Sequence, residues 1–461
     1  MAIIRAYALP HPPLAVPDVG RGQENKISRT IQAFNDASEE IAELAPETIV
    51  FITPHNVLYA DYFHISPGES ARGDFSRFNA PGVRFNTRYD TKLVEEISRI
   101  AGREGIPAGT LGERDEKLDH GVMVPMWFIN NRYTDYMSVR ISQSGLDPSG
   151  HYRLGQSIAE AAELAGRKTV LIASSDMSHK LKREGPYGYA PEGPEFDDAV
   201  VEILSKGDFL SLLEIPETLR ERAAECGYNS LVVMAGCYDR RKVDAMTLSY
   251  EGPYGVGYAI ASFAPGERDD SRNFLEKFEE SQLISARKSR NDEDRYRSLA
   301  RRSLEHAIKN GDTLKLPDDL PDELMKNKAG VFVSLHKNGR LRGCIGTIAP
   351  TTANIAREII QNAVSAGLKD SRFDPVSAEE LPYLTYKVDV LAEPEPISGP
   401  DELDVKRYGV IVTSGYKRGL LLPNLEGIDT VEEQISIARK KAGISEGSPV
   451  KLERFEVIRH E

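Results

Sequence analysis

The chain has 461 residues, of which 40% are hydrophobic and 28% charged, a composition typical of a globular protein with two or three domains. The formal net charge of −13 argues against a nucleic-acid-binding protein, because phosphate contacts require clustered lysine and arginine. No apolar run reaches the roughly 18–20 residues that span a bilayer. The N-terminal residues lack the pattern of a signal peptide, and the three cysteines show no CxxC spacing. We therefore expect a cytoplasmic protein with reduced thiols and no membrane contact.

Residues 1–265 alternate between segments with strand patterns and segments with helix patterns. Strands are predicted at residues 2–9, 48–53, 137–141, 168–174, 242–250 and 257–263. Helices are predicted at residues 25–44, 90–104, 151–165, 197–205 and 216–226. The runs at 48–53 and 168–174 are continuously apolar, which is typical of strands buried on both faces. This order predicts an α/β domain with a mixed, largely parallel central sheet flanked by helices.

Residues 266–294 are rich in charge and poor in apolar side chains, which predicts a solvated linker with a helical portion. An interdomain helix is the alternative. Residues 295–461 then form a second unit, in which Asn338-Gly339 is a strong hairpin signal. Its helices are predicted at 296–308, 351–367 and 430–442, and its strands at 330–335, 341–346, 385–391, 409–414 and 419–422. Locally paired strands with inserted helices predict an α+β domain.

Six of the nine histidines lie in the first 180 residues, and four of them end or follow a stretch with the pattern of a buried strand. These four are His11, His55, His120 and His179. Strand ends are where α/β folds place their chemistry, and neutral imidazole is the commonest protein metal ligand. Each histidine alone also fits an ordinary loop or turn, but together they predict a metal site in this half of the chain.

A non-haem Fe(II) oxygenase holds its metal with two histidines and one carboxylate and leaves positions open for substrate and dioxygen. Here His11 and His55 are candidate ligands, and Glu225 could be the carboxylate. Fe(II) is accordingly the first metal that the pattern suggests.

Such chemistry also needs a proton-transfer group close to the metal. His179 could be this base, with Asp176 three residues earlier as its neighbour. Asp176 could instead cap a helix. His120 could orient or protonate a bound substrate.

Four short motifs in this half resemble the class III extradiol ring-cleavage dioxygenase superfamily. They are Pro-His-Pro-Pro at 10–13, Thr-Pro-His at 53–55, Leu-Asp-His-Gly at 118–121 and Ser-Asp-Met-Ser-His at 175–179. The resemblance covers about residues 1–265 and implies an Fe(II) site with His11 and His55 as ligands. It also implies a small catecholic substrate, an aromatic diol, with His179 as acid/base and His120 in contact with substrate or dioxygen.

Residues 223–227, Ala-Ala-Glu-Cys-Gly, depart from the dioxygenase pattern. The Cys226-Gly227 pair looks like the Memo branch of the superfamily, in which ring cleavage is not assured. A thiolate ligand would favour softer metals such as Zn or Cu(I). Cys226 could also be a small buried side chain, so the third ligand stays open between Glu225 and Cys226.

The most distinctive string of the C-terminal unit is Leu-Arg-Gly-Cys-Ile-Gly-Thr at 341–347. Arg342 places a cation near the Cys344 thiol, which could make that cysteine reactive or could bind a carboxylate or phosphate. A plain strand with a buried cysteine is the alternative. The polar residues predicted to share a groove are Arg342, Cys344, Ser371, Arg372 and Asp374.

The string at 341–347 resembles the AMMECR domain, with support from the strings at 371–376, 408–412, 419–423 and 441–444. The resemblance covers about residues 295–461 and carries no established activity. A fusion of a Memo-like and an AMMECR-like domain, as in this chain, resembles one component of a prokaryotic system that also includes a radical S-adenosylmethionine protein. The resemblance therefore implies two functions, a metal dioxygenase or a non-oxygenase partner of a radical enzyme; a homo-oligomer remains open.

Overall fold

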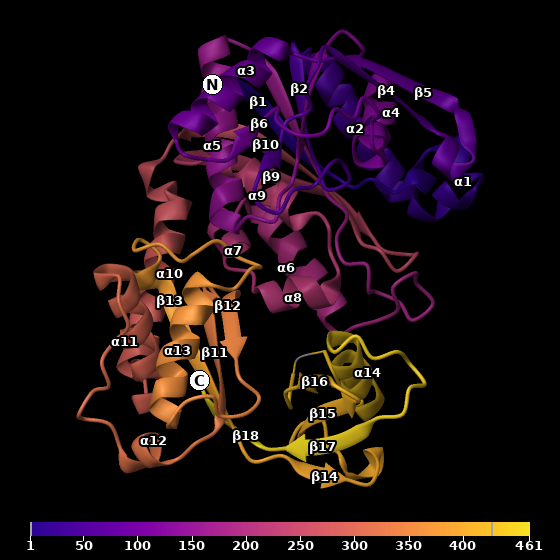
Figure 1. Cartoon of the computed structure of the whole chain (residues 1–461). Helices are drawn as coiled ribbons and strands as arrows, with labels where there is room; N and C mark the ends of the chain where they lie inside the picture. The colour runs from indigo at the N-terminus through magenta and orange to yellow at the C-terminus, as the bar shows by residue number, and fades with distance from the viewer. Residues whose placement is uncertain (1, 426) are drawn as a thin grey trace. The chain divides into compact units, whose positions relative to one another are not determined.

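The computed structural model describes residues 2–425 and 427–461 (Figure 1). The chain divides into two compact units, Met1–Glu279 and Glu280–Glu461. None of the helices in the described ranges has the length and apolar character needed to cross a bilayer.

A six-stranded mixed sheet forms the centre of the first unit, with the strand order β7-β2-β8-β1-β10-β9. The first four of these strands are parallel, and β10 and β9 continue the sheet in antiparallel fashion. In sheet order the bounds are β7 Met137–Ser142, β2 Thr48–Thr53, β8 Thr169–Ser174, β1 Ile3–Leu9, β10 Tyr258–Arg268 and β9 Arg241–Glu251. The predicted α/β class with a largely parallel sheet is confirmed.

Two hydrophobic cores cover the two faces of this sheet. In β2, Val50 and Ile52 belong to one core, whereas Ile49 and Phe51 belong to the other, because successive side chains of a strand point to opposite faces. The first core is closed by α3 Thr91–Arg103, α5 Pro148–Ala165, α6 Glu192–Lys206, α7 Phe209–Leu213 and α9 Tyr228–Gly236. The second is closed by α2 Ser28–Leu44 and α4 His120–Asn130. The layered arrangement buries the sheet on both sides, as parallel sheets require.

Shorter elements complete the first unit. An antiparallel hairpin of β4 Ser70–Phe75 and β5 Ala80–Arg88 turns through the 3-10 helix η3 Ser76–Phe78. The remaining elements are η1 Pro13–Ala15, α1 Pro17–Gly20, η2 Gln23–Ile27, β3 Phe63–His64, β6 Ala108–Gly109, α8 Glu217–Ala223 and η4 Asp270–Arg272. The hairpin was not predicted, and it forms one wall of the site described below.

The charged segment after β10 contains α10 Phe274–Asn291. Phe274, Leu275 and Phe278, at the start of this helix, are buried in the core of the first unit. The helix crosses the boundary between the two units at residue 279.

The second unit contains two antiparallel sheets, in the orders β12-β11-β13-β18 and β14-β17-β15-β16. The first comprises β11 Gly330–Lys337, β12 Arg340–Gly346, β13 Leu384–Leu391 and β18 Val457–His460. The second comprises β14 Glu395–Ile397, β15 Gly409–Ser414, β16 Lys417–Leu421 and β17 Lys451–Phe455. The helices are α11 Arg295–Asn310, α12 Asp322–Lys326, α13 Ile355–Leu368 and α14 Val431–Lys441, with η5 Leu381–Tyr383 and η6 Pro400–Glu402. The predicted α+β class is confirmed.

The predicted hairpin at Asn338-Gly339 joins β11 to β12, and both residues have a positive φ. The helix expected from residue 351 begins at Ile355 instead. The reason is that the Asn354 side chain caps it, while Thr351 and Thr352 bind the buried Glu358 carboxylate.

Candidate metal centre

Three side chains from separate parts of the chain meet at the carboxyl-terminal edge of the parallel strands. His11 and His55 each lie two residues past the ends of β1 and β2, and Cys226 precedes α9. The Nε2 atoms of the two histidines are 3.0 Å apart, and the Cys226 Sγ is 3.5 Å from the Nε2 of His11. One ligand atom from each of the three residues lies within 4.8 Å of the others. This cluster could hold a metal ion.

The ring of His11 is held in a fixed orientation by the end of strand β8. His11 is 1% exposed, and its Nδ1 lies 2.9 Å from the Oγ of Ser174. The Ser174 hydroxyl donates its only proton to the Gly121 carbonyl, at 2.6 Å. Its oxygen must therefore accept from Nδ1–H, which leaves the lone pair on Nε2 free for a metal.

His55 and His120 stack beside this cluster. Their ring centroids are 4.1 Å apart, and the backbone N–H of His55 donates to the Thr53 hydroxyl at 3.2 Å. The expectation that His120 follows a buried strand is wrong, because it is the first residue of α4. The irregular segment before this helix brings His120 beside His55.

His179 and Asp176 lie on the third side of the cluster. The Nε2 of His179 is 3.8 Å from the Cys226 Sγ, and its ring packs 5.0 Å from that of Tyr187. Asp176 does not cap a helix: its Oδ1 accepts from the backbone N–H of His11 at 2.7 Å, and its Oδ2 is 3.7 Å from the His11 Nε2. Through these interactions Asp176 contacts His11 and not His179.

Glu225 and Cys226 differ in what their side chains contact. The Oε2 of Glu225 accepts from the backbone N–H of Tyr228, the first residue of α9, at 2.7 Å. A carboxylate at this position stabilises the start of a helix. Cys226 is held through its carbonyl, which accepts from the Gln143 side chain at 2.9 Å. Within the described residues, the thiol and not the carboxylate joins the two histidines.

The environment keeps the imidazoles neutral at pH 7. Burial lowers the pKa of His11 well below its ordinary value and that of His55 to about 4. Burial, together with the charge of Arg77, lowers the pKa of His120 to about 4, and burial also lowers the pKa of His179. Neutral imidazole is the form that binds metals.

The pKa values of the acidic groups shift in the opposite direction. Burial raises the pKa of the Asp176 and Glu225 carboxyls to about 7, and raises that of the Cys226 thiol well above its ordinary value. A metal that binds the Cys226 sulfur would therefore have to displace its proton.

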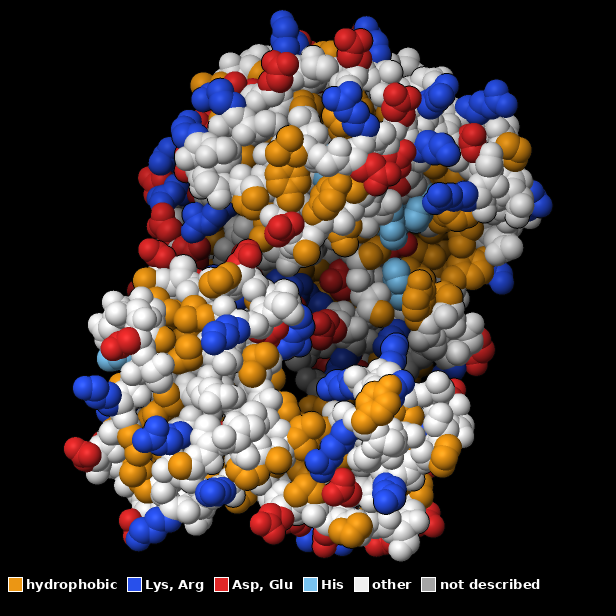
Figure 2. Space-filling model, in the orientation of Figure 1, with side chains coloured by type: hydrophobic (Ala, Val, Ile, Leu, Met, Phe, Trp, Pro, Cys, Tyr) orange, Lys and Arg blue, Asp and Glu red, His pale blue; other side chains and the backbone are white. Residues whose placement is uncertain are grey.

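A cleft of about 810 Å³ opens onto this cluster and is lined by His55 and His120. The hairpin β4–β5 and residues 115–120 form its walls. Figure 2 shows histidine side chains at the surface of the N-terminal unit, beside a group of hydrophobic side chains and several lysines or arginines.

The wall at residues 115–120 is fixed by one buried arginine. Arg140 donates to the carbonyls of Asp115 and Lys117, each at 2.6 Å, and to the Ser66 hydroxyl at 2.7 Å. Its guanidinium also lies 3.7 Å from the carboxylate of Asp119, the residue before His120. Sequence reasoning missed Arg140, Ser174 and Gln143, because a single polar residue at a strand end carries no motif.

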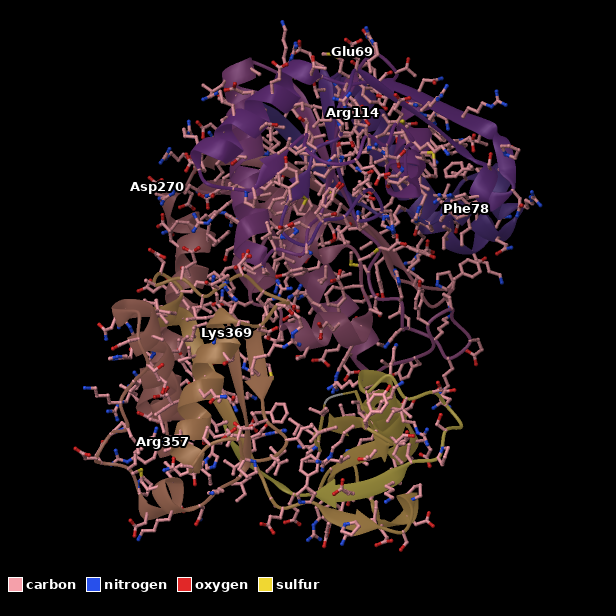
Figure 3. The ribbon with its side chains drawn as sticks, viewed as in Figure 1. Glu69, Phe78, Arg114, Asp270, Arg357 and Lys369 are labelled. Atoms are coloured by element: carbon pink, nitrogen blue, oxygen red, sulfur yellow. The ribbon has the colours of Figure 1, made fainter. Side chains whose placement is uncertain are left out.

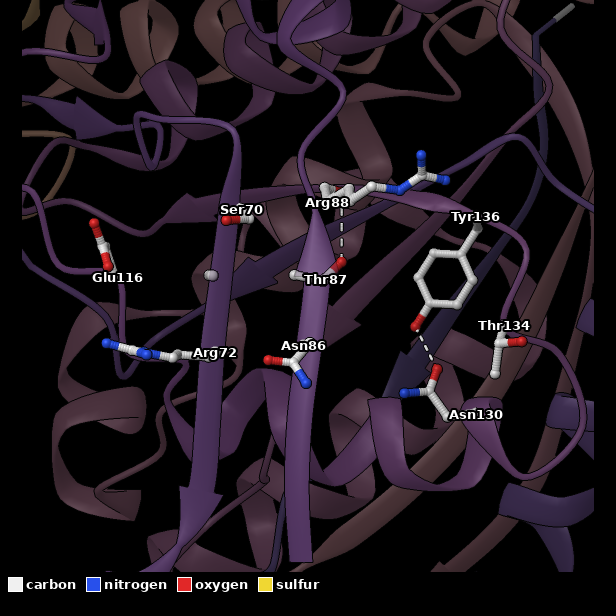
Figure 4. Close-up of a pocket in the computed structure, with 10 residues that line it drawn as sticks. Ser70, Arg72, Asn86, Thr87, Arg88, Glu116, Asn130, Thr134 and Tyr136 are labelled. Carbon is white, nitrogen blue, oxygen red and sulfur yellow. Dashed lines mark hydrogen bonds between the residues drawn. The ribbon is translucent and has the colours of Figure 1, made fainter.

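Other pockets lie away from the histidines. One of about 540 Å³ is lined by both strands of the hairpin and by Tyr136, which donates to Asn130 at 2.8 Å (Figure 4). Another, of about 570 Å³, runs along α13 in the second unit, with Arg357 in the helix and Lys369 after its end (Figure 3).

In the second unit, part of the predicted groove is brought together. The Asp370 carboxylate accepts from the backbone N–H of Cys344 at 2.9 Å and from the Arg372 guanidinium at 2.7 Å. Arg342 is engaged by Glu380 through two hydrogen bonds of 2.9 and 3.0 Å. The Cys344 Sγ accepts from the Ser334 hydroxyl at 3.2 Å.

The other two predicted groove residues, Ser371 and Asp374, are exposed, and within the described residues no hydrogen bond or ion pair joins their side chains to this cluster. Both arginines bind carboxylates of the chain, Arg342 through Glu380 and Arg372 through Asp370, whereas the Nη1 of Arg342 has no hydrogen-bond partner among the described residues.

Comparisons with known proteins cover both units. A family model described as the catalytic LigB subunit of aromatic ring-opening dioxygenase matches residues 5–261, and one described as AMMECR1 matches residues 297–460. Protein CA_C1420 of Clostridium acetobutylicum is 41% identical over 468 residues, which span 100% of this chain and 99% of the relative.

Two further relatives match part of the chain. A protein of Thermotoga maritima is 50% identical over 167 residues, which span 36% of this chain and 96% of the relative. The crystal structure of the uncharacterized protein PH0010 from Pyrococcus horikoshii is 35% identical, covers 36% of this chain and 88% of its own, and has a TM-score of 0.33. The chain therefore belongs to the LigB family of aromatic ring-opening dioxygenase subunits, and it carries an AMMECR1 domain in its C-terminal part.

Proposed function

We propose that the N-terminal domain is a metal-dependent enzyme of the extradiol dioxygenase type, in which His11, His55 and Cys226 hold the metal. The observation that carries this proposal is the convergence of these three side chains at the end of an 810 Å³ cleft. The cleft is large enough for a small molecule such as an aromatic diol.

The donor set fits a metal ion. Zinc bonds of about 2.0–2.1 Å to nitrogen and about 2.3 Å to sulfur place two tetrahedral ligand atoms roughly 3.3–3.6 Å apart. The 3.5 Å between Cys226 Sγ and His11 Nε2 matches this spacing, and the two histidine nitrogens, 3.0 Å apart, need only a small outward shift. The tautomer that Ser174 imposes on His11 also suits a metal ligand.

The remaining groups support proton transfer beside the metal. A bound metal would supply Lewis-acid polarisation of a coordinated diol, and in the case of iron access to dioxygen. His179, whose pKa is lowered by burial, is neutral at pH 7 and could accept a diol proton at Nε2. His120 lines the cleft and could donate to or orient the substrate.

The contacts of Cys226 favour a second candidate function. A His/His/Cys donor set suits Zn or Cu(I) better than the Fe(II) of a two-histidine, one-carboxylate site. In this case the domain is a Memo-like metal-binding partner, acting beside a radical S-adenosylmethionine protein without ring cleavage.

Metal-loaded full-length protein and a catechol distinguish the two functions. The enzyme requires that catechol perturb the metal site and that dioxygen be consumed in step with diol loss. A protein that binds its metal tightly but neither binds catechol nor consumes dioxygen would contradict the enzymatic proposal and favour the partner role. Loss of the metal in His55→Ala, with the fold retained, is expected under either function, and loss of turnover is expected under the enzymatic one.

A further inference from the structure

The hairpin of β15 and β16 in the second unit carries an aromatic side chain that the fold leaves in solvent. Ser414 and Lys417 pair at the ends of the two strands, so the turn consists of Gly415 and Tyr416. Gly415 has a φ of 60°, which a two-residue hairpin turn requires of its first residue, whereas the turn has no need of an aromatic second residue. Tyr416 is 95% exposed, and within the described residues its ring forms no stacking or cation–π contact. Both faces of the ring are therefore open to a planar ligand.

Three elements bring lysines to this end of the second sheet. Lys417 follows the ring directly, and its ammonium group donates to the Gly443 carbonyl, so the tip of the hairpin lies against the end of α14. The last turn of α14 supplies two more lysines, and β17 begins with a fourth, which pairs with Thr413 of β15. Figure 2 shows several lysine or arginine side chains gathered over β16 and α14. All four lysines are exposed, and with the tyrosine they form the basic hairpin tip, which consists of Tyr416, Lys417, Lys440, Lys441 and Lys451.

The lysines of the basic hairpin tip have no carboxylate partners. Within residues 2–425 and 427–461, none of the four forms an ion pair within 4.0 Å. Glu453, on the strand next to the hairpin, is already bound by Arg418 at 3.1 Å. Glu446, in the loop after α14, offsets one lysine and leaves the tip positively charged. The whole chain has a net charge of −13, so a polyanion can bind to it only where cations gather locally.

The combination of an open aromatic ring with clustered lysines favours one class of polyanion. Single-stranded nucleic acids present phosphates to cations and flat bases to aromatic side chains, and proteins that bind them without sequence preference supply both groups. An acidic peptide would engage the lysines alone. An anionic membrane would require a larger apolar surface, and in the described parts of the second sheet and α14 Tyr416 is the only large hydrophobic side chain that is exposed.

We propose that the basic hairpin tip binds single-stranded nucleic acid, with a base stacked on Tyr416 and the neighbouring phosphates bound by Lys440, Lys441 and Lys451. Stacking accepts the face of every base, so the binding is expected to be independent of sequence. This site lies in the AMMECR1 domain, contains no residue of the metal centre and adds a binding function to the proposed one.

Fluorescence anisotropy with the full-length protein tests the proposal. The labelled probes have about 12 nucleotides, which lies in the range of single-strand sites. They are oligodeoxyuridylate, oligouridylate and an abasic deoxy strand with the same phosphates. Oligodeoxyuridylate is expected to bind about tenfold more tightly than the abasic strand, because only the former has bases that stack on Tyr416. Since the two uridylates share their base, their relative affinity identifies DNA, RNA or both as the ligand.

Variants separate stacking from charge. Tyr416→Ala should reduce the preference over the abasic strand to within about twofold, and Tyr416→Phe, which keeps the ring, should retain it. Lys440→Gln/Lys441→Gln should lower the slope of log affinity against log salt concentration by about 1.4, at about 0.7 for each lost phosphate contact. The matched control is Lys315→Gln/Lys328→Gln, which removes the same charge from two exposed lysines outside the tip and should leave the slope unchanged.

Four results would overturn the proposal. They are the absence of binding to both uridylates, equal binding of oligodeoxyuridylate and the abasic strand, a preference that survives in Tyr416→Ala, and an equal loss of slope in the control. A polyglutamate peptide of the same charge that binds as tightly as the uridylates would also overturn it, and would assign the tip to an acidic protein. None of these measurements depends on the metal or on a catechol, so their outcome is independent of the proposed function.

Discussion

The Nδ1 atom of His11 lies 2.9 Å from the Ser174 Oγ, which in turn donates to the Gly121 carbonyl. These two successive hydrogen bonds fix the proton of His11 on Nδ1 and direct Nε2 toward Cys226. Ser174→Ala should therefore lower metal affinity by about 10–100-fold, the usual effect of removing a group that orients a metal-binding histidine. Titration calorimetry under anaerobic conditions measures the change.

Ser175→Ala is the matched control for that variant. The Ser175 hydroxyl donates to the Ala173 carbonyl at 3.1 Å and, within the described residues, forms no hydrogen bond with His11. Its metal affinity should equal that of the native protein. Equal affinities in the two variants would contradict the role of Ser174.

The three cysteines should respond differently to an alkylating reagent. Cys226 and Cys344 are half-buried, whereas Cys237 is 3% exposed. Metal should protect Cys226, because a coordinated sulfur is no longer a free nucleophile, and it should leave the labelling of Cys344 unchanged. Cys237 should react only on unfolding. Peptide mass spectrometry with and without metal gives the alkylation rates of all three cysteines. If the rate at Cys226 is the same with and without metal, Cys226 is excluded as a ligand.

The buried Arg140 should be important for stability and for the cleft wall. Arg140→Met removes three hydrogen bonds and leaves the Asp119 carboxylate without its buried partner. Breaking such a pair costs about 3–5 kcal/mol of unfolding free energy. Hydrogen exchange of the β2 amides in the full chain reports this loss.

A second substitution separates the effect of the unpaired Asp119 charge from the effect of the hydrogen bonds that Arg140→Met removes. Asp119→Asn in the Arg140→Met background should recover part of the stability, because the amide carries no charge. A double variant that is no more stable than Arg140→Met would show that the cost lies in the lost hydrogen bonds to the carbonyls.

Asp197 should make stability depend on pH. It is fully buried, its Oδ1 accepts from the Ser178 N–H at 2.7 Å and its Oδ2 from the Tyr250 hydroxyl at 2.6 Å. Burial raises its pKa to about 7 from an ordinary value of 3.8. The folded state thus holds a proton that the unfolded state releases between those two pH values. This contribution to stability is present at low pH and is lost as pH rises toward 7, with a slope of at most about 1.4 kcal/mol per pH unit.

Asp197→Asn removes this titrating group while keeping the shape of the side chain. Comparison of native and variant hydrogen exchange in β9 and β10 between acidic and neutral pH isolates the contribution of Asp197 from that of the other buried carboxyls. A native slope no steeper than that of the variant would show that Asp197 is ionised in the folded protein.

The sequence was most informative where burial leaves a regular pattern. The apolar runs of β2 and β8 and the helix α3 were all predicted, since each follows from local physical chemistry. The β4–β5 hairpin was missed because its strands are charged and partly exposed, so the alternation of apolar and polar residues is weak. Helix α4 was missed because Pro125 lies in its interior, where proline usually ends a helix.

The candidate site, like the fold, could be predicted only in part from the sequence. The positions of His11 and His55 after predicted strands led to both residues, because parallel strands end at one edge of a sheet. The sequence could not decide whether Glu225 or Cys226 is the third ligand, because the two residues are adjacent. The choice depends on where α9 begins, since Glu225 contacts the first N–H of that helix while Cys226 turns toward His11.

The most direct test of the account is the metal content of anaerobically purified full-length protein, compared with that of His11→Ala, Cys226→Ser and Glu225→Gln. The account predicts a near-stoichiometric metal that is lost in His11→Ala and in Cys226→Ser and is kept in Glu225→Gln. A metal kept in Cys226→Ser but lost in Glu225→Gln would contradict the His11, His55 and Cys226 site, and would restore the two-histidine, one-carboxylate arrangement.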